Sequence, residues 1–320
     1  MIKVRGLAKT FKTRGRTVPA VQGVDIDVAE GEMVGFLGPN GAGKSTTLRM
    51  LATLLRPSAG EAVVAGCDLL SDPSGVRRRI GYVGQGNGAG AGQRVAEELI
   101  TQARLYGMPA AAARERVGEL LERFDLAALG ERTAGTLSGG QRRRLDIVMG
   151  VLHQPRLIFL DEPSTALDPQ SRNNLWQHIR SLRDEHNCTV FLTTHYLDEV
   201  DALCERILII DAGRIIAEGS PDVLKAEISG DQVTLGVSDP AEAAATVTRE
   251  PEVQDLTTHG THLSFRVPGG DTVVPVLMRA LDAAGVTVTS VQIQRPTLDD
   301  VFLTLTGRSL REAGPTPDPA

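Results

Sequence analysis

The stretch 38–46 constrains what this chain can fold into more than any other part of the sequence. It fits the phosphate-binding loop pattern, in which a glycine and four further residues are followed by Gly-Lys-Ser. An apolar run at 33–37 precedes the stretch and a helix-compatible run at 47–51 follows it, so the loop would join a strand to a helix. The residues of the loop are Gly38, Pro39, Asn40, Gly41, Ala42, Gly43, Lys44, Ser45 and Thr46.

The chemistry of this loop is that of an anion site. Glycines let the backbone fold tightly enough for successive N–H groups to point at one phosphate, and the following helix adds its positive end. Lys44 would neutralise the β- and γ-phosphates of a nucleotide, and the Ser45 hydroxyl would take one position on Mg²⁺. A glycine-rich turn without function is the alternative, but it does not explain why Lys44, Ser45 and both flanking elements occur together. The loop therefore predicts a nucleotide-binding α/β domain.

Length and charge limit the class of protein and the kinds of partner that the chain can have. The chain has 320 residues, of which 41% are hydrophobic, enough for two domains with cores. Acidic residues outnumber basic ones, 40 against 34, and the net charge of −6 gives no reason to expect nucleic acid as a partner. There is no apolar run long enough for a membrane span and no signal-peptide core, so we expect a cytosolic chain. Cys67, Cys188 and Cys204 are expected to be reduced core residues.

The first domain shows three kinds of pattern. Alternating strands at 2–7 and 21–28, joined by a polar turn, predict an antiparallel β subdomain. Phe11 lies just before that turn, where its ring could stack on a purine base or pack in the core; the sequence does not decide between these. After the glycine-rich stretch 86–92, which suggests a hinge or contact loop, helical patterns predict a helical subdomain at about 86–152. The helical segments are expected at 93–105, 110–124 and 142–152.

The composition changes after Pro221, which indicates a second domain. Its patterns read, in order, strand, helix, strand, strand, helix and strand, which suits a small split β-α-β layer. These segments are 233–237, 241–248, 253–258, 263–267, 272–284 and 286–294, and an amphipathic helix at 297–305 follows. We therefore assign 1–222 to the nucleotide-binding domain, 223–308 to a small α+β accessory domain, and 309–320 to a disordered tail.

Five further motifs follow the phosphate loop along the chain. An apolar strand at 157–162 ends in Asp161 and Glu162, as expected of a buried parallel strand whose carboxylates lie beside the loop. Asp161 could hold Mg²⁺ through its hydration shell, and Glu162 could polarise an attacking water. Ser138, Gly139 and Gly140 open a helix and so form a second anion site. The other elements of the set are Gln85, the run 137–141 that reads Leu-Ser-Gly-Gly-Gln and ends in Gln141, the loop 164–168, and His195.

Together these motifs resemble the ATP-binding-cassette ATPases over residues 1 to about 220. The resemblance implies a P-loop ATPase fold with a helical insertion, and ATP and Mg²⁺ as cofactors. It also implies that His195 contacts the γ-phosphate, that Gln85 senses Mg²⁺ and water, and that Asp168 lies in a loop crossing a dimer interface. The residues 138–141 would complete the nucleotide site of a second subunit. Because the single set of motifs is complete, we expect a homodimer that closes on ATP.

The segment 295–307 carries a second resemblance, to the end of cassette subunits from daunorubicin-resistance-type drug exporters. It implies the ATPase subunit of an exporter of a drug, antibiotic or lipid-like substrate, docked on a separately encoded permease at the cytoplasmic face of the cell membrane. An importer ATPase, or a soluble cassette ATPase of translation or DNA maintenance, is the alternative. Ala166 and the glycine-rich stretch 86–92 depart from the family pattern, so no permease-contact residue is carried over.

Overall fold

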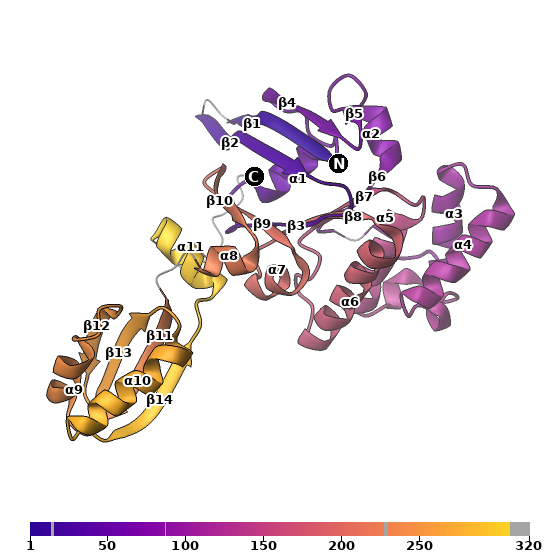
Figure 1. Cartoon of the computed structure of the whole chain (residues 1–320). Coiled ribbons are helices and arrows are strands. Elements are labelled where there is room, and N and C mark those ends of the chain that lie inside the picture. The colour runs from indigo at the N-terminus through magenta and orange to yellow at the C-terminus, as the bar shows by residue number, and fades with distance from the viewer. Residues whose placement is uncertain (14–15, 87, 227–229, 308–320) are drawn as a thin grey trace. The chain divides into compact units, whose positions relative to one another are not determined.

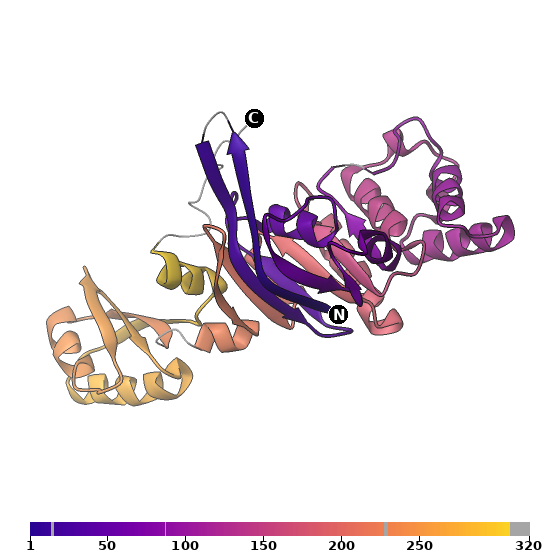
Figure 2. The same cartoon turned by 90° about the horizontal axis from the view of Figure 1, so that it is seen from above.

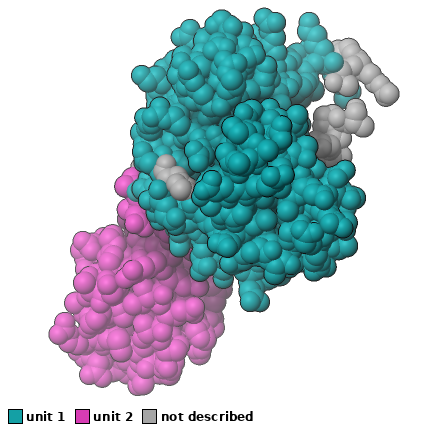
Figure 3. Space-filling model, turned by 90° about the vertical axis from the view of Figure 1, so that its right-hand side faces the viewer, with its two compact units in different colours: residues 1–221, 310–320 teal, residues 222–309 magenta. Residues whose placement is uncertain are grey.

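The computed structural model describes residues 1–13, 16–86, 88–226 and 230–307. The chain divides into two compact units, Met1–Pro221 and Asp222–Ser309, coloured separately in Figure 3. The expected tail, 309–320, lies outside the described residues. None of the helices in the described part of the chain has both the length and the apolar character needed to cross a bilayer.

A six-stranded sheet forms the centre of the first unit (Figure 1). Its strand order is β10-β9-β3-β8-β7-β6, and all neighbours pair in parallel except the terminal hairpin partners β9 and β10. Every residue of β3, β7 and β8 is buried, which explains the nearly continuous apolar sequences of β3 and β7. The strands are β3 (Met33–Leu37), β6 (Ile80–Val83), β7 (Leu157–Asp161), β8 (Thr189–Thr194), β9 (Arg206–Asp211) and β10 (Arg214–Gly219).

A second, antiparallel sheet of order β2-β1-β4-β5 lies in the same unit, and β1 and β2 are its long indigo strands in Figure 2. It comprises β1 (Ile2–Thr13), β2 (Arg16–Val28), β4 (Ala59–Val64) and β5 (Cys67–Asp68). Its inner residues share one core with α1 (Lys44–Leu51) and with the central sheet. Phe36, Phe159 and Phe191 fill this core, with ring centroids 5.7 Å apart for Phe36–Phe191 and 5.9 Å apart for Phe159–Phe191. The hairpin strands are longer than predicted because cross-strand pairing extends through the polar residues near the tip.

The helical part of the first unit contains α3 (Val95–Leu105), α4 (Ala110–Arg123) and α5 (Gly139–Val151). α5 begins three residues before the periodic segment 142–152, where Ser138, Gly139 and Gly140 were predicted to open a helix. A capping box causes this early start: the Ser138 hydroxyl accepts from the Gln141 N–H at 3.3 Å, and the Gln141 side chain accepts from the Ser138 N–H at 3.0 Å. The other helices are α2 (Pro73–Arg79), α6 (Pro169–His186) and α7 (Leu197–Leu203), and α8 (Pro221–Ala226) spans the unit boundary; the sequence analysis missed α2 and α8.

The second unit is an antiparallel sheet covered by two helices. The strand order is β12-β13-β11-β14, and side chains from α9 and α10 join the sheet residues in one core. The predicted element order is therefore confirmed. The elements are β11 (Asp231–Val237), α9 (Pro240–Val247), β12 (Gln254–His259), β13 (His262–Val267), α10 (Gly270–Ala283) and β14 (Val288–Gln294), followed by α11 (Leu298–Thr306).

We predict that Leu235→Ala destabilises the second unit alone. Leu235 is fully buried in the central strand β11, so truncation should lower the free energy of unfolding of that unit by about 2–5 kcal/mol. Hydrogen–deuterium exchange of the full chain should then rise in β11–β14 and stay unchanged in β3 and β7. Val291→Ala, at an exposed position of β14, is the control. Equal acceleration of exchange in both units would contradict separate cores.

Candidate active site

The loop 38–43 between β3 and α1 is packed so closely that two of its positions have no room for a side chain and must be glycine. A Cβ added at Gly38 would lie 2.2 Å from the main-chain oxygen of Ile210. Gly43 precedes α1 with a φ of 108°, and a Cβ there would lie 2.6 Å from the main-chain oxygen of Ala20. Both positions exclude a side chain, so the loop stays tight and its N–H groups converge.

Lys44 is folded back over this loop. Its ammonium donates to the carbonyls of Gly38 at 2.7 Å and Pro39 at 3.0 Å, and lies 3.5 Å from Glu162 Oε1. Burial lowers the pKa of Lys44, while the charge of Glu162 opposes that shift. A buried cation held mainly by two neutral carbonyls can gain from a stronger anionic partner, and a phosphate oxygen at the loop would provide one.

Asp161 and Ser45 form a small polar network at the end of β7. Oδ1 of Asp161 accepts from the hydroxyls of Ser45 at 2.9 Å and Thr193 at 2.6 Å, and Gln85 Nε2 donates to Ser45 Oγ at 3.2 Å. Asp161 is fully buried, and its Oδ2 has no hydrogen-bond partner. An unsatisfied buried carboxylate oxygen is costly, and a divalent cation near Ser45 and Asp161 would relieve that cost.

The chemistry of this network fits Mg²⁺ rather than a metal caged by protein. Within the described residues there is no group of three or more His, Cys, Asp or Glu that could hold a metal ion. Mg²⁺ usually keeps several waters and binds through one or two protein ligands and substrate phosphates. One hydroxyl and one carboxylate beside a phosphate loop match that preference.

Glu162 follows directly and occupies a strained backbone position with a φ of 47°. Its Oε1 lies 3.3 Å from Nδ1 of His195, and its Oε2 accepts from the Thr165 hydroxyl at 3.2 Å. Burial alone would raise the pKa of Glu162, but contact with His195 and the charge of Lys44 outweigh it, so the pKa is lowered. The carboxylate is therefore held ionised, as a group that accepts a proton or orients water must be.

The remaining predicted residues make their hydrogen bonds within helix caps, although Gly139 lines a small pocket together with Gln85 and Glu162. Among the described residues, no hydrogen bond joins 138–141 or Asp168 to the loop 38–46. Ser138 and Gln141 cap α5, and Asp168 caps α6 by accepting from the N–H of Ser171 at 2.9 Å and from its hydroxyl at 2.6 Å. These bonds to Ser171 lower the pKa of Asp168. One chain thus joins Lys44, Ser45, Gln85, Asp161, Glu162 and His195 by direct contacts, whereas Ser138, Gln141 and Asp168 are bonded within the caps of α5 and α6.

Phe11 is 38% exposed, so it does not pack in the core. It pairs with Val18 across β1 and β2, and Lys9 Nζ lies 5.3 Å from the centre of its ring. Val18 is two residues from Ala20, whose carbonyl approaches Gly43. The ring is thus exposed on the hairpin of β1 and β2, and base stacking stays a prediction.

Three residues of the site were missed from sequence: Thr193, Thr165 and Arg143. Thr193 bonds Asp161 from the neighbouring strand, and the position of a hydroxyl residue two places before His195 was the available signal. Thr165 contacts Glu162 from within the loop 164–168. Arg143 bonds only main-chain carbonyls of the site, and such bonds leave no side-chain pattern to read.

A parallel sheet with a phosphate loop, a strand-end Asp-Glu pair and a capped Leu-Ser-Gly-Gly-Gln helix define an ATP-binding-cassette ATPase. Residues 21–165 match the family model described as ABC transporter, and 219–306 match that of the ATP-binding protein DrrA1-3-like C-terminal domain. The chain belongs to this ABC transporter family, in the group of DrrA-like ATP-binding proteins. It is an ATPase and the ATP-hydrolysing subunit of an exporter.

Known relatives cover nearly the whole chain. The daunorubicin/doxorubicin resistance ATP-binding protein DrrA of Streptomyces peucetius is 44% identical over 323 residues, covering 98% of this chain and 96% of that protein. The linearmycin resistance ATP-binding protein LnrL of Bacillus subtilis is 36% identical and covers 91% of this chain and 95% of its own length. A solved dimeric ATP-binding cassette, in a post-hydrolysis state with ADP and Pi, is 27% identical with a TM-score of 0.64, covering 69% of this chain and 98% of that one.

We predict that Thr193→Val raises the Mg²⁺ concentration needed for half-maximal ATPase activity about 5- to 30-fold. The substitution removes the hydroxyl that donates to Asp161, a charge-assisted bond whose loss costs about 1–2 kcal/mol. Mg²⁺ titrations at saturating ATP measure the effect. Thr189→Val, the same change on β8 where the hydroxyl accepts from the Gly31 N–H, should leave the midpoint unchanged. An unchanged midpoint in Thr193→Val would refute the metal role of Asp161.

Proposed function

We propose that two copies of this chain bind Mg-ATP between them at the cytoplasmic face of the cell membrane and drive efflux through a separately encoded permease. The observation that carries the proposal is the division of the motifs into two groups within one chain. Lys44, Asp161 and Glu162 converge on one sheet edge, whereas the hydrogen bonds of Ser138 and Asp168 stay within the caps of α5 and α6. A second copy would bring the two groups together.

In this proposal each residue of the first group has a chemical role. Lys44 and the N–H groups of 38–46 would bind the phosphates. The Ser45 hydroxyl would hold Mg²⁺ directly, and Asp161 would hold it through the water of its hydration shell. Glu162 polarises the attacking water, since its lowered pKa keeps it ionised. Gln85, bonded to Ser45, reports the state of that metal site to the helical part, and His195 contacts the γ-phosphate. Phe11 stacks on the adenine.

The second group would act on the nucleotide of the partner copy. Ser138 and the N–H groups of Gly139 and Gly140 would bind the γ-phosphate at the helix N-terminus, with Gln141 closing the cap. Asp168 would lie at the dimer interface. The dimeric cassettes among the structural neighbours support this arrangement.

The relatives support export as the direction of transport. Besides the resistance proteins, the Nod factor export ATP-binding protein I of Burkholderia pseudomallei is 38% identical over 292 residues. Neither an importer nor a soluble ATPase of translation or DNA maintenance is favoured by these relatives. We propose an amphipathic drug, antibiotic or lipid-like compound as the substrate, which the permease would select.

We expect Glu162→Gln to trap a dimer in ATP and Mg²⁺, because the closed state forms but cannot hydrolyse. Light scattering after size exclusion should give twice the monomer mass. Adding Ser138→Arg should return the protein to a monomer while its Kd for ATP changes less than about threefold, since the arginine blocks only the partner's site. A monomeric Glu162→Gln protein, or equal loss of ATP binding from Ser138→Arg, would argue against the shared site.

The membrane partner is tested by purification from the native cell. The tagged chain should copurify in mild detergent with a polytopic membrane protein, and reconstitution with that protein should raise kcat and make it respond to added drugs. Glu162→Gln in the reconstituted complex is the control for background ATPase. Recovery with ribosomes or DNA alone would refute the exporter assignment.

A further inference from the structure

Arg143 lies on α5, four residues after the first residue of that helix, and within the described residues all its side-chain hydrogen bonds go to main-chain oxygens. Its Nε donates to the carbonyl of Pro163 at 2.8 Å, and its Nη2 to those of Asp161 at 3.0 Å and Glu162 at 3.3 Å. Its Nη1 donates to the carbonyl of Gly84 at 2.6 Å. The residue is only 8% exposed. One guanidinium group thus hydrogen-bonds the chain at the ends of both β7 and β6.

The carbonyls at 161–163 need such a partner because the strand stops there. β7 ends at Asp161, and Glu162 turns out of the sheet with a φ of 47°. On the N–H side, Glu162 is held by donation to the Thr193 carbonyl at 3.0 Å. On the carbonyl side, the acceptors face Arg143. The backbone that aims the Glu162 carboxylate is therefore fixed from both sides, and a planar fork of donors suits several carbonyls at once.

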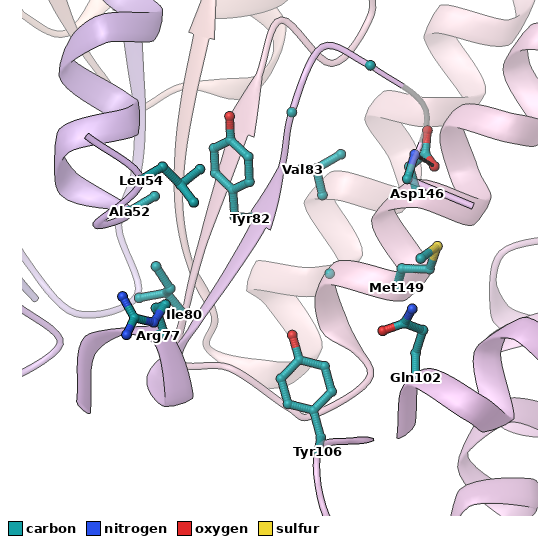
Figure 4. Close-up of a pocket in the computed structure, with 14 residues that line it drawn as sticks. Ala52, Leu54, Arg77, Ile80, Tyr82, Val83, Gln102, Tyr106, Asp146 and Met149 are labelled. Atoms are coloured by element: carbon teal, nitrogen blue, oxygen red, sulfur yellow. Dashed lines mark hydrogen bonds between the residues drawn. The ribbon is translucent and has the colours of Figure 1, made fainter. Parts of the chain in front are cut away.

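Asp146, one helical turn after Arg143, performs the same task on the neighbouring loop. It is 5% exposed, and its Oδ1 accepts from the N–H of Gly88 at 2.9 Å. Arg143 and Asp146 together hold both ends of the segment that carries Gln85. Asp146 also lines a pocket of about 280 Å³, where Figure 4 shows it beside Met149.

We propose that Arg143 is a positioning residue for hydrolysis, which aims Glu162 by clamping its backbone and, with Asp146, keeps Gln85 in register with it. This inference rests on the proposed function of Glu162 and Gln85. α5 thereby joins three parts of the molecule: the capped end at Ser138, the pocket at Asp146, and the catalytic strand end. A shift of this helix moves the general base and the Gln85 segment together.

The test replaces Arg143 by Met, which keeps much of the side-chain volume and removes every donor. We expect kcat for ATP to fall about tenfold or more, because small displacements of a catalytic group carry costs of this size. The Kd for ATP should stay within about twofold, since Arg143 contacts no part of the phosphate loop in the described structure. Arg143→Met combined with Glu162→Gln should still dimerise on ATP, because clamping serves hydrolysis and not closure.

Arg144→Met is the matched control, since Arg144 is adjacent on α5 and its side chain donates to Asn174 on α6. It should retain the wild-type kcat. Arg143→Lys keeps the buried charge without the fork, so it should fold even if the Met variant does not, and should show the same loss of kcat. Melting temperatures are measured for all variants.

Three outcomes would overturn the proposal. The first is a wild-type kcat in Arg143→Met, and the second is full activity in Arg143→Lys. The third is failure of the Arg143→Met, Glu162→Gln protein to dimerise when Glu162→Gln alone does, which would assign Arg143 to the capped helix instead. Absence of ATPase activity in the wild-type chain, with or without its permease, would refute the proposed function itself and is thereby distinguishable.

Discussion

The parallel pairing of β3, β8, β7 and β6 is the constraint on which the rest of the site depends. Leu37 lies beside Thr194, and Asp161 beside Thr193, so these strands end along one edge. A different functional group lies at the end of each strand: the phosphate loop follows β3, His195 follows β8, the two carboxylates lie at the end of β7, and Gln85 follows β6. Residues far apart in sequence therefore meet without any dedicated supporting loop.

This convergence buries charged side chains away from water. The cost of burying them is offset by hydrogen bonds to main-chain oxygens. Lys44 is held by two loop carbonyls and Arg143 by four strand-end carbonyls, and burial lowers the pKa of both. Carbonyls stabilise a cation without neutralising it. The positive charge of Lys44, which lies 3.5 Å from Glu162 Oε1, is thus not neutralised by the carbonyls and remains available to the phosphates.

What could be predicted from the sequence follows from the kind of signal each element carries. The fully apolar strands and the periodic helices of both units were predicted, because burial on every face dictates their composition. The short helix α2 was not, because it has too few turns for a period. The periodic pattern placed the third helical segment at 142–152, whereas the capping residues 138–140 indicated the start that α5 takes at Gly139. Ser45 and Asp161 were predicted to act together because both side chains belong to recognisable motifs. Arg143 was not predicted, because it bonds main-chain carbonyls, which every residue has and which leave no sequence pattern.

Close packing also fixes the starts of α5 and α6, which would face a second copy. A Cβ at Gly140 would lie 2.7 Å from the Ser171 hydroxyl, so the start of α5 packs directly on the start of α6. That hydroxyl donates to Asp168, which caps α6. Ser138 and Asp168 are therefore positioned by one another's helices before any partner arrives. Because Arg143 extends the same helix to Glu162, the elements proposed to act on the partner's nucleotide are mechanically continuous with those that act on the chain's own.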